Sequence, residues 1–294
     1  MVTKIEELDK FGNNLPRYAA TTPVEVPSCE VGNAVRIGYD FSDSVSLESL
    51  LYNKGSEYLV VSLHGALNRK TFELPRFERL ATLLKREESG FFIADPSLYL
   101  DQTLELAWFT GWEGYNLFED LAVLIENAAS AVAAKKIVLS GSSGGGFAAL
   151  QLAALIPGSI ALVFNPQTDV HTYWQGGDPT KHGAVRKYIE VAYPSAAPDG
   201  IWKIDWSKDW SREFGTLHSP QRTYKNKVDS QVVYVNNAND FHVEQHYVPF
   251  LNVLQESGQE HILTTYTYDG AEGHFPPDPK TFNAGLDLAL SVAS

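Results

Sequence analysis

Short runs of apolar residues recur along the chain, and longer segments with helical periodicity separate them. Within each run nearly every position is apolar, which is typical of parallel strands that are covered on both faces. Six runs predict buried strands: Tyr58–Leu63, Phe91–Ala94, Lys136–Ser140, Ile160–Phe164, Gln231–Val235 and Ile262–Tyr268. A further strand over Val35–Phe41 is expected to be antiparallel and to lie at an edge of the sheet.

Apolar residues spaced close to every 3.6 positions predict helices between these strands. Four are expected: an amphipathic helix over Tyr115–Ala134, a buried one of small residues over Gly145–Leu155, and amphipathic ones over Val243–Glu256 and Lys280–Val292. Alternation of strands and helices predicts one α/β domain over residues 1–294, with a mostly parallel sheet and helices on both faces.

The segment Thr168–Ser230 interrupts this alternation. It has no convincing buried strand and holds four of the six tryptophans, including Trp174. Such a long excursion predicts a cap or lid folded over the carboxyl edge of the sheet. Trp202, Trp206 and Trp210 recur every four residues, which predicts one helix face. That face either packs the insertion onto the body or forms an aromatic wall for a sugar or an acyl chain.

Composition and charge narrow the class of protein. Of 294 residues, 44% are hydrophobic and 20% charged, as in ordinary globular chains. A net charge of −13 without any basic run makes nucleic acid an unexpected partner. The single cysteine, Cys29, excludes a disulfide scaffold and a Cys-rich metal site. Without an apolar segment of membrane-spanning length or a secretory signal, a soluble cytoplasmic protein is expected, with no membrane partner.

The most informative segment is Lys136–Leu150, which reads KIVLSGSSGGGFAAL. Gly141 to Gly145 match G-x-S-x-G, between a β-branched strand and a helix of small residues, which is the strand–turn–helix setting of a nucleophile elbow. Ser143 would sit on a strained turn with its hydroxyl exposed, and the helix N-terminus would direct N–H groups at developing negative charge. A P-loop is excluded because no Gly-Lys-Ser/Thr follows. A Gly/Ser-rich turn without chemistry is the alternative.

On these residues the sequence resembles the α/β-hydrolase family over most of the chain outside the insertion. The resemblance implies a nucleophile, an acid and a histidine in that order, each at the end of a strand. His274, in a glycine-containing loop after the last strand, is then expected to take the proton of Ser143. Asp240, which follows the preceding strand, is expected to orient the imidazole. Two alternatives remain: Asp240 only caps the next helix, or Asp169 is the acid.

The resemblance also implies two backbone N–H donors for an oxyanion. Gly144, directly after the nucleophile, would supply one of them. The second is expected from Ala66, or else Leu67, because Leu63 to Leu67 resembles the His-Gly oxyanion turn of the family. His64 in this turn is expected to organise the loop. Such a triad requires neither a cofactor nor a metal.

Three residues are predicted to contact the substrate: Trp112, Gln167 and Trp174. Gln167 follows the strand after the nucleophile helix, so that its side chain should face the site, and Trp108 and Trp112 could line the entrance. The stretches GSSGGGFAAL and NPQTDV are similar to hydrolase-like proteins of bacterial polysaccharide loci. That similarity implies an acylated glycan as one possible substrate.

His242 and His246 are four residues apart, a spacing that could place two zinc ligands on one helix face. The metalloprotease pattern requires a glutamate directly after the first histidine, where this chain has Val243. Both histidines are therefore expected at the surface or at the rim of the site.

These patterns predict a serine hydrolase that cleaves a carboxylic ester, on a small molecule or a glycan, through an acyl-enzyme. An acyltransferase or amidase with the same serine is one alternative. A catalytically silent binding module for a glycan or a protein is another. The acyl group, the alcohol and the oligomeric state stay open.

Overall fold

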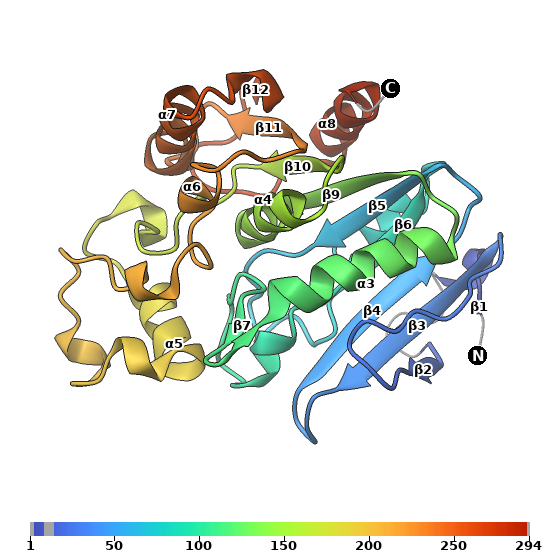
Figure 1. The fold of residues 1–294 in the computed structure, drawn as a ribbon, viewed down its shortest axis with the longest axis horizontal. Coiled ribbons are helices and arrows are strands. Elements are labelled where there is room, and N and C mark those ends of the chain that lie inside the picture. The colour runs from blue at the N-terminus through green and yellow to red at the C-terminus, as the bar shows by residue number, and fades with distance from the viewer. Residues whose placement is uncertain (1–2, 9–14, 293–294) are drawn as a thin grey trace.

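The computed structural model describes residues 3–8 and 15–292, which fold around a ten-stranded sheet (Figure 1). Its strands are β1 (Thr3–Lys4), β2 (Arg17–Ala19), β3 (Asn33–Asp40), β4 (Ser46–Tyr52), β5 (Tyr58–Leu63), β6 (Ser89–Ile93), β9 (Lys136–Ser142), β10 (Ile160–Phe164), β11 (Gln231–Asn237) and β12 (Leu263–Tyr268). Their order is β1-β3-β4-β6-β5-β9-β10-β11-β12, and β2 pairs with β3. The hairpin of β7 (Gly111–Trp112) and β8 (Tyr115–Asn116) is separate.

The six predicted strands form the parallel part of the sheet, from β6 through β5 and β9 to β12. The last of them, β12, is not buried as predicted, because it is the edge strand and its residues are half-buried or exposed. The predicted strand near Val35 is antiparallel as expected, but it is not at the edge, because β1 and β2 pair with its other side. Its partner β4 was not predicted. Glu48 interrupts the apolar run of β4, and its buried carboxylate is paired with Arg17 and Arg36 at 2.7 and 2.8 Å.

Helices cover both faces of the sheet. One face carries α3 (Leu117–Ala131), α4 (Gly144–Leu155) and α7 (Val248–Glu256), and the other carries α2 (Leu80–Leu83) and α8 (Pro279–Val292). Neighbouring residues of β9 show why apolar side chains lie on both faces of this strand. Leu139 packs in the hydrophobic core under α3, α4 and α7, and Val138 packs in the core under α2 and α8. Neither side chain is exposed. Burying such a side chain contributes roughly 1.5–3 kcal/mol.

Between β10 and β11 the chain has no strand and lies beyond the carboxyl ends of the parallel strands (Figure 1). This stretch holds short helices: η4 (Gln175–Gly177), α5 (Gly183–Ala192), η5 (Pro194–Ala196), η6 (Ile201–Lys203), η7 (Arg212–Phe214) and α6 (Pro220–Thr223). The role of this stretch as a cap stays a prediction.

The prediction of one helix face for the three tryptophans is wrong. Trp202 lies in the short η6, while Trp206 and Trp210 follow in turns. Asp205 and Asp209 each accept a hydrogen bond from the backbone N–H two residues on, and these local bonds compete with a helix.

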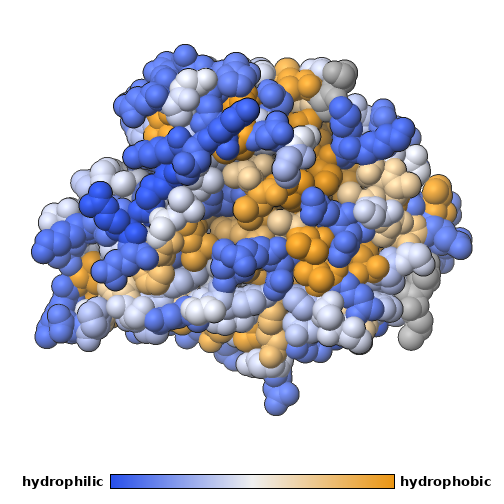
Figure 2. Space-filling model, viewed as in Figure 1, coloured by the Kyte–Doolittle hydropathy of each residue, from blue (hydrophilic) through white to orange (hydrophobic). Residues whose placement is uncertain are grey.

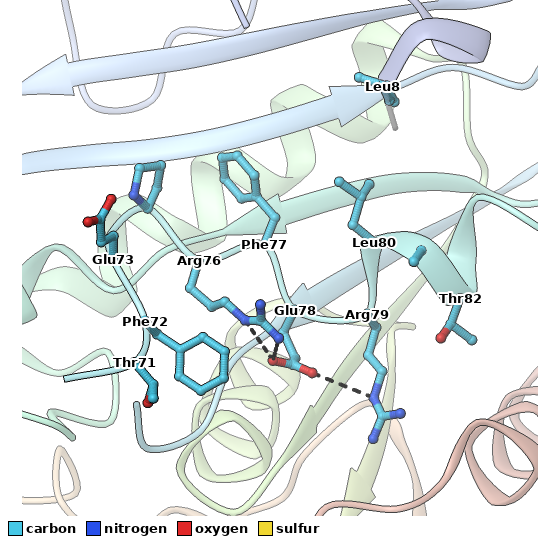
Figure 3. A pocket seen from close by; sticks show the side chains of 12 residues that line it. Leu8, Thr71, Phe72, Glu73, Arg76, Phe77, Glu78, Arg79, Leu80 and Thr82 are labelled. Carbon is cyan, nitrogen blue, oxygen red and sulfur yellow. Dashed lines mark hydrogen bonds and ion pairs between the residues drawn. The ribbon is translucent and has the colours of Figure 1, made fainter. Parts of the chain in front are cut away.

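Hydrophilic residues cover most of the face shown in Figure 2, with hydrophobic ones gathered over its centre. No helix in the described part of the chain is long and apolar enough to cross a membrane. A hollow of about 700 Å³ lies along the loop of residues 71–82 (Figure 3). There Glu78 pairs with Arg76 and Arg79, and Phe72 lies against Arg76. None of the predicted catalytic residues lines this hollow.

Candidate active site

Ser143 occupies the sharp turn between β9 and α4. Its backbone angles, φ 55° and ψ −122°, lie in a region that costs a non-glycine residue about 1–3 kcal/mol. The flanking glycines explain how the turn closes. A methyl group on Gly141 would lie 2.2 Å from the carbonyl carbon of Gly145, and one on Gly145 would lie 2.2 Å from the carbonyl oxygen of Leu63. The half-buried Ser143 thus lies at the N-terminus of α4, as the motif predicts.

Asp240 and His274 form a hydrogen-bonded pair. Asp240 follows β11, and its Oδ2 lies 2.7 Å from Nδ1 of His274, in the loop between β12 and α8. The carboxylate is fully buried, whereas the imidazole is 22% exposed. Its second oxygen accepts the backbone N–H of His242 at 2.9 Å. Each carboxylate oxygen of Asp240 therefore accepts a hydrogen bond. One of these bonds fixes Nδ1 of His274, whose ring is still partly exposed to solvent.

The segment Asn165–Thr168, after β10, contacts both halves of the site. Gln167 donates from Nε2 to Oγ of Ser143 at 2.8 Å, and the carbonyl oxygen of Asn165 accepts from Nδ1 of His242 at 2.9 Å. Within residues 3–8 and 15–292, no hydrogen bond joins Ser143 to His274. In unliganded enzymes such a bond is often long and tightens only with substrate. Gln167 thus lies at Ser143, and its predicted contact with the substrate stays a prediction.

Trp108 is a site residue whose role sequence reasoning did not identify. Its indole N–H donates to Oε1 of Gln167 at 3.2 Å, which orients the amide toward Ser143. Trp108 and Phe109 both have positive φ, 55° and 59°. The buried carboxylate of Asp95 holds this strained pair by accepting the N–H of Phe109 at 2.8 Å. Positive φ at two bulky residues leaves no pattern in the sequence that could have revealed it.

The loop after β5 lies against the elbow. A methyl group on Gly65 would be 3.4 Å from Cβ of Ser143 and 3.8 Å from the nitrogen of Gly144. The N–H of Leu67, the alternative donor for the oxyanion, already donates to the carbonyl oxygen of Glu105 at 2.8 Å. No acceptor for the N–H of Ala66 occurs among the described residues.

His64 organises this loop. Burial lowers the pKa of His64, so that the ring is neutral at pH 7. Its Nε2 accepts the N–H of Asp95 at 3.0 Å, and its Nδ1 therefore carries the proton and donates to the carbonyl oxygen of Gly65 at 2.8 Å. These two bonds turn the Gly65 carbonyl toward His64.

His242 and His246 are buried, so the prediction that they lie at the surface or rim is wrong. The ring of His242 stacks on that of His274, with centroids 3.9 Å apart and planes 31° apart. His246 packs edge-on against His242 and accepts the N–H of Thr168. Burial lowers the pKa of His242 well below its usual range and that of His246 to about 3. Both rings are therefore neutral at pH 7.

Replacing His242 with alanine is expected to lower kcat by about tenfold, because the His274 ring loses the surface that fixes its plane. His242→Phe keeps a stacked ring without the Nδ1 donor, and its kcat should stay within about threefold of wild type. Ester turnover over a range of substrate concentrations separates kcat from KM. Equal losses in both variants, at unchanged unfolding temperatures, would contradict this role.

Asp169, the alternative acid, lies elsewhere. Its carboxylate accepts the N–H of Thr172 at 3.2 Å, and no bond to His274 occurs among the described residues. Trp112 stacks on Tyr115 with centroids 4.8 Å apart. Trp174 is half-buried at the start of η4. Neither of these tryptophans has a recorded contact with Ser143, and their substrate-binding roles stay predictions.

A metal ion has one candidate set of ligands in the described part of the chain. Ligand atoms of Asp240, His242 and His274 lie within 4.8 Å of one another. The planes of the two imidazoles are tilted by 31° to each other. Asp240 and His274 are also bonded to each other. This geometry favours the hydrogen-bonded pair over a metal centre.

Solved structures similar to this chain share its architecture. The capsule O-acetyltransferase of Neisseria meningitidis serogroup A matches 87% of this chain and 93% of its own, at 14% identity and a TM-score of 0.59. Carboxyl esterase 2 from the fungus Tuber melanosporum matches 98% and 94%, at 14% identity and a TM-score of 0.54. The glycosylation associate protein complex from Streptococcus agalactiae matches 88% of this chain and 45% of its own, at 15% identity and a TM-score of 0.57.

No protein-family model matches the sequence, and no curated protein matches it. The similarity to solved structures, together with the mostly parallel sheet and its helices on both faces, nevertheless shows the fold. The chain has the α/β-hydrolase fold.

Proposed function

We propose that this protein is a serine hydrolase that cleaves a carboxylic ester. Oγ of Ser143 attacks the acyl carbon while Nε2 of His274 accepts the hydroxyl proton. The same nitrogen then protonates the departing alcohol. Water, deprotonated by His274, attacks the acyl-enzyme, and the imidazolium returns the proton to Oγ of Ser143 as the acid leaves. Asp240 holds the imidazole in the tautomer with the proton on Nδ1 and stabilises the imidazolium that forms.

The observation that carries this proposal is the buried Asp240–His274 bond at the sheet edge where Ser143 sits in its strained turn. Strained residues with positive φ and titratable side chains with buried charged partners concentrate at functional sites. The combination of such a serine with a carboxylate-bound, partly exposed histidine therefore favours a catalytic role. The N–H groups of Gly144 and Ala66 are the donors for the oxyanion, since Gly65 brings the two loops together.

The names of the structural neighbours support an acyl group as the reacting part. One is a capsule O-acetyltransferase and another a carboxyl esterase. The former favours a second candidate function, transfer of an acyl group to a glycan hydroxyl by the same serine, and an acylated glycan as substrate. The ratio of transferred to hydrolysed product, measured with an added sugar acceptor, distinguishes the two reactions.

Labelling with a fluorophosphonate tests the proposal. The probe phosphorylates a serine that an adjacent base activates, so we expect one covalent adduct per chain, on the peptide that carries Ser143. Mass spectrometry of the digested protein locates the adduct, and heat-denatured protein is the control. An adduct on another serine, or none on the folded protein, would contradict the proposed function.

A further inference from the structure

A second hollow, of about 530 Å³, opens beside α5 in the insertion. Its lining includes three cationic side chains, Lys181, Arg186 and Lys187, and one acid, Glu190. The chain as a whole carries a net charge of −13. Carboxylates pair with both lysines, so attraction of an anion to this hollow depends on Arg186.

Arg186 differs from the two lysines. Lys181 and Lys187 each have a carboxylate oxygen within 3.4 Å of the ammonium nitrogen. Arg186 has no carboxylate partner among the described residues, and one of its terminal nitrogens donates to the carbonyl oxygen of Ile201 at 2.8 Å. A guanidinium has five N–H donors in a planar fork. Most of those on Arg186 are therefore available to an anionic group from outside.

Aromatic rings hold this guanidinium in place. Its central carbon lies 4.5 Å from the ring centre of Trp202 and 5.2 Å from that of Trp206. Trp206 in turn stacks on His182, with ring centres 4.0 Å apart and planes 4° apart. Cation–π contacts of this kind reduce the freedom that the side chain loses on binding. Trp202 is itself 81% exposed, so much of its indole is free to stack on a ligand.

One turn of chain separates this hollow from the candidate active site. Gln175, at the start of η4, lines the hollow. Gly177, at the end of η4, lies against Phe241, because a methyl group on it would be 3.1 Å from Cβ of Phe241. The ring of Phe241 is 5.9 Å from that of His274. These contacts link the hollow to His274 through Gly177 and Phe241, and the proposal requires an extended molecule to span that distance.

We propose that the hollow binds an acidic saccharide, a sugar ring with a carboxylate that belongs to the glycan whose ester reacts at Ser143. This inference rests on the proposed function for the reacting ester. The carboxylate pairs with the guanidinium of Arg186, and the C–H face of the sugar lies on Trp202. One unpaired cation matches one carboxylate. A nucleotide such as CoA, which would be held through its phosphates and not through a sugar carboxylate, is the other occupant that the titration distinguishes.

Calorimetric titration of the Ser143→Ala protein tests this binding without turnover. The probes are tetragalacturonate, maltotetraose as its neutral match, and CoA. We expect tetragalacturonate to bind about tenfold or more tightly than maltotetraose, and Arg186→Gln or Trp202→Ala to weaken it by about tenfold. Phe72→Ala is the matched control, because Arg76 lies 4.7 Å from that ring in a similar pair outside the hollow. It should leave the affinity unchanged.

Equal affinity for the acidic and neutral saccharides, or no binding of tetragalacturonate, would overturn the proposal. So would an equal loss in Phe72→Ala and Arg186→Gln. Binding of CoA that depends on Arg186, without binding of tetragalacturonate, would also overturn it and assign the hollow to a nucleotide. Failure of the proposed function appears separately, as missing fluorophosphonate label on Ser143, which this titration does not involve.

Discussion

Ser143→Ala is expected to lower kcat for ester hydrolysis by about 10⁴- to 10⁶-fold, because it removes the atom that forms the acyl-enzyme. Binding should change little, so KM should stay within about threefold. Alanine keeps the Cβ at this position and therefore keeps the strained backbone of the turn. Steady-state hydrolysis of p-nitrophenyl esters of increasing chain length measures both constants.

Ser142 provides the matched control. It precedes the turn, ends β9 and is half-buried like its neighbour. Ser142→Ala should retain turnover within about threefold of wild type, because its hydroxyl has no step to perform. Loss of activity in Ser142→Ala, with Ser143→Ala still active, would remove Ser143 as the nucleophile.

The Ser143→Ala protein should nevertheless be slightly less stable. Gln167 is fully buried, and its Nε2 donates to the serine hydroxyl. Without that acceptor, an unsatisfied buried donor costs about 1–3 kcal/mol. A fall of a few degrees in the unfolding temperature is compatible with an intact fold. A much larger fall would mean that lost turnover reports unfolding.

The parallel half of the sheet could be predicted because both of its faces are covered. Neighbouring residues such as Val138 and Leu139 pack in different cores, so apolar residues are favoured at successive positions. The same logic fails for β4, where a buried ion pair between Glu48 and the arginines of neighbouring strands replaces an apolar contact. A single sequence does not show which charged residues find buried partners.

The candidate site likewise has a part that the sequence predicts and a part that only the structure reveals. Ser143, Asp240 and His274 follow from a motif and from their order at strand ends, which are properties of the chain. The stacking of His242 on His274 and the bond from Trp108 to Gln167 depend on the path of loops. At Trp108 that path includes a positive φ at a bulky residue, which no propensity predicts. Supporting contacts between distant loops therefore need the structure.

Asp240→Asn is expected to lower kcat by about 10⁴-fold through the wrong histidine tautomer. The aspartate accepts two N–H groups, from the backbone of His242 and from Nδ1 of His274. An asparagine has one carbonyl oxygen. If that oxygen keeps the backbone bond, the amide NH₂ faces Nδ1 of His274, and the ring proton moves to Nε2. An imidazole with its proton on Nε2 cannot accept the proton of Ser143.

Asp169→Asn is the control that distinguishes the two candidate acids. Asparagine has the same size as aspartate and keeps an oxygen that can accept the N–H of Thr172, so the substitution is a mild change. Turnover in Asp169→Asn should stay within about threefold of wild type. Measured kcat values for both variants, each shown to be folded by thermal unfolding, decide the assignment. The group that holds the imidazole is the one whose neutralisation stops proton transfer. Loss of turnover in Asp169→Asn, with turnover retained in Asp240→Asn, would therefore assign the acid to Asp169.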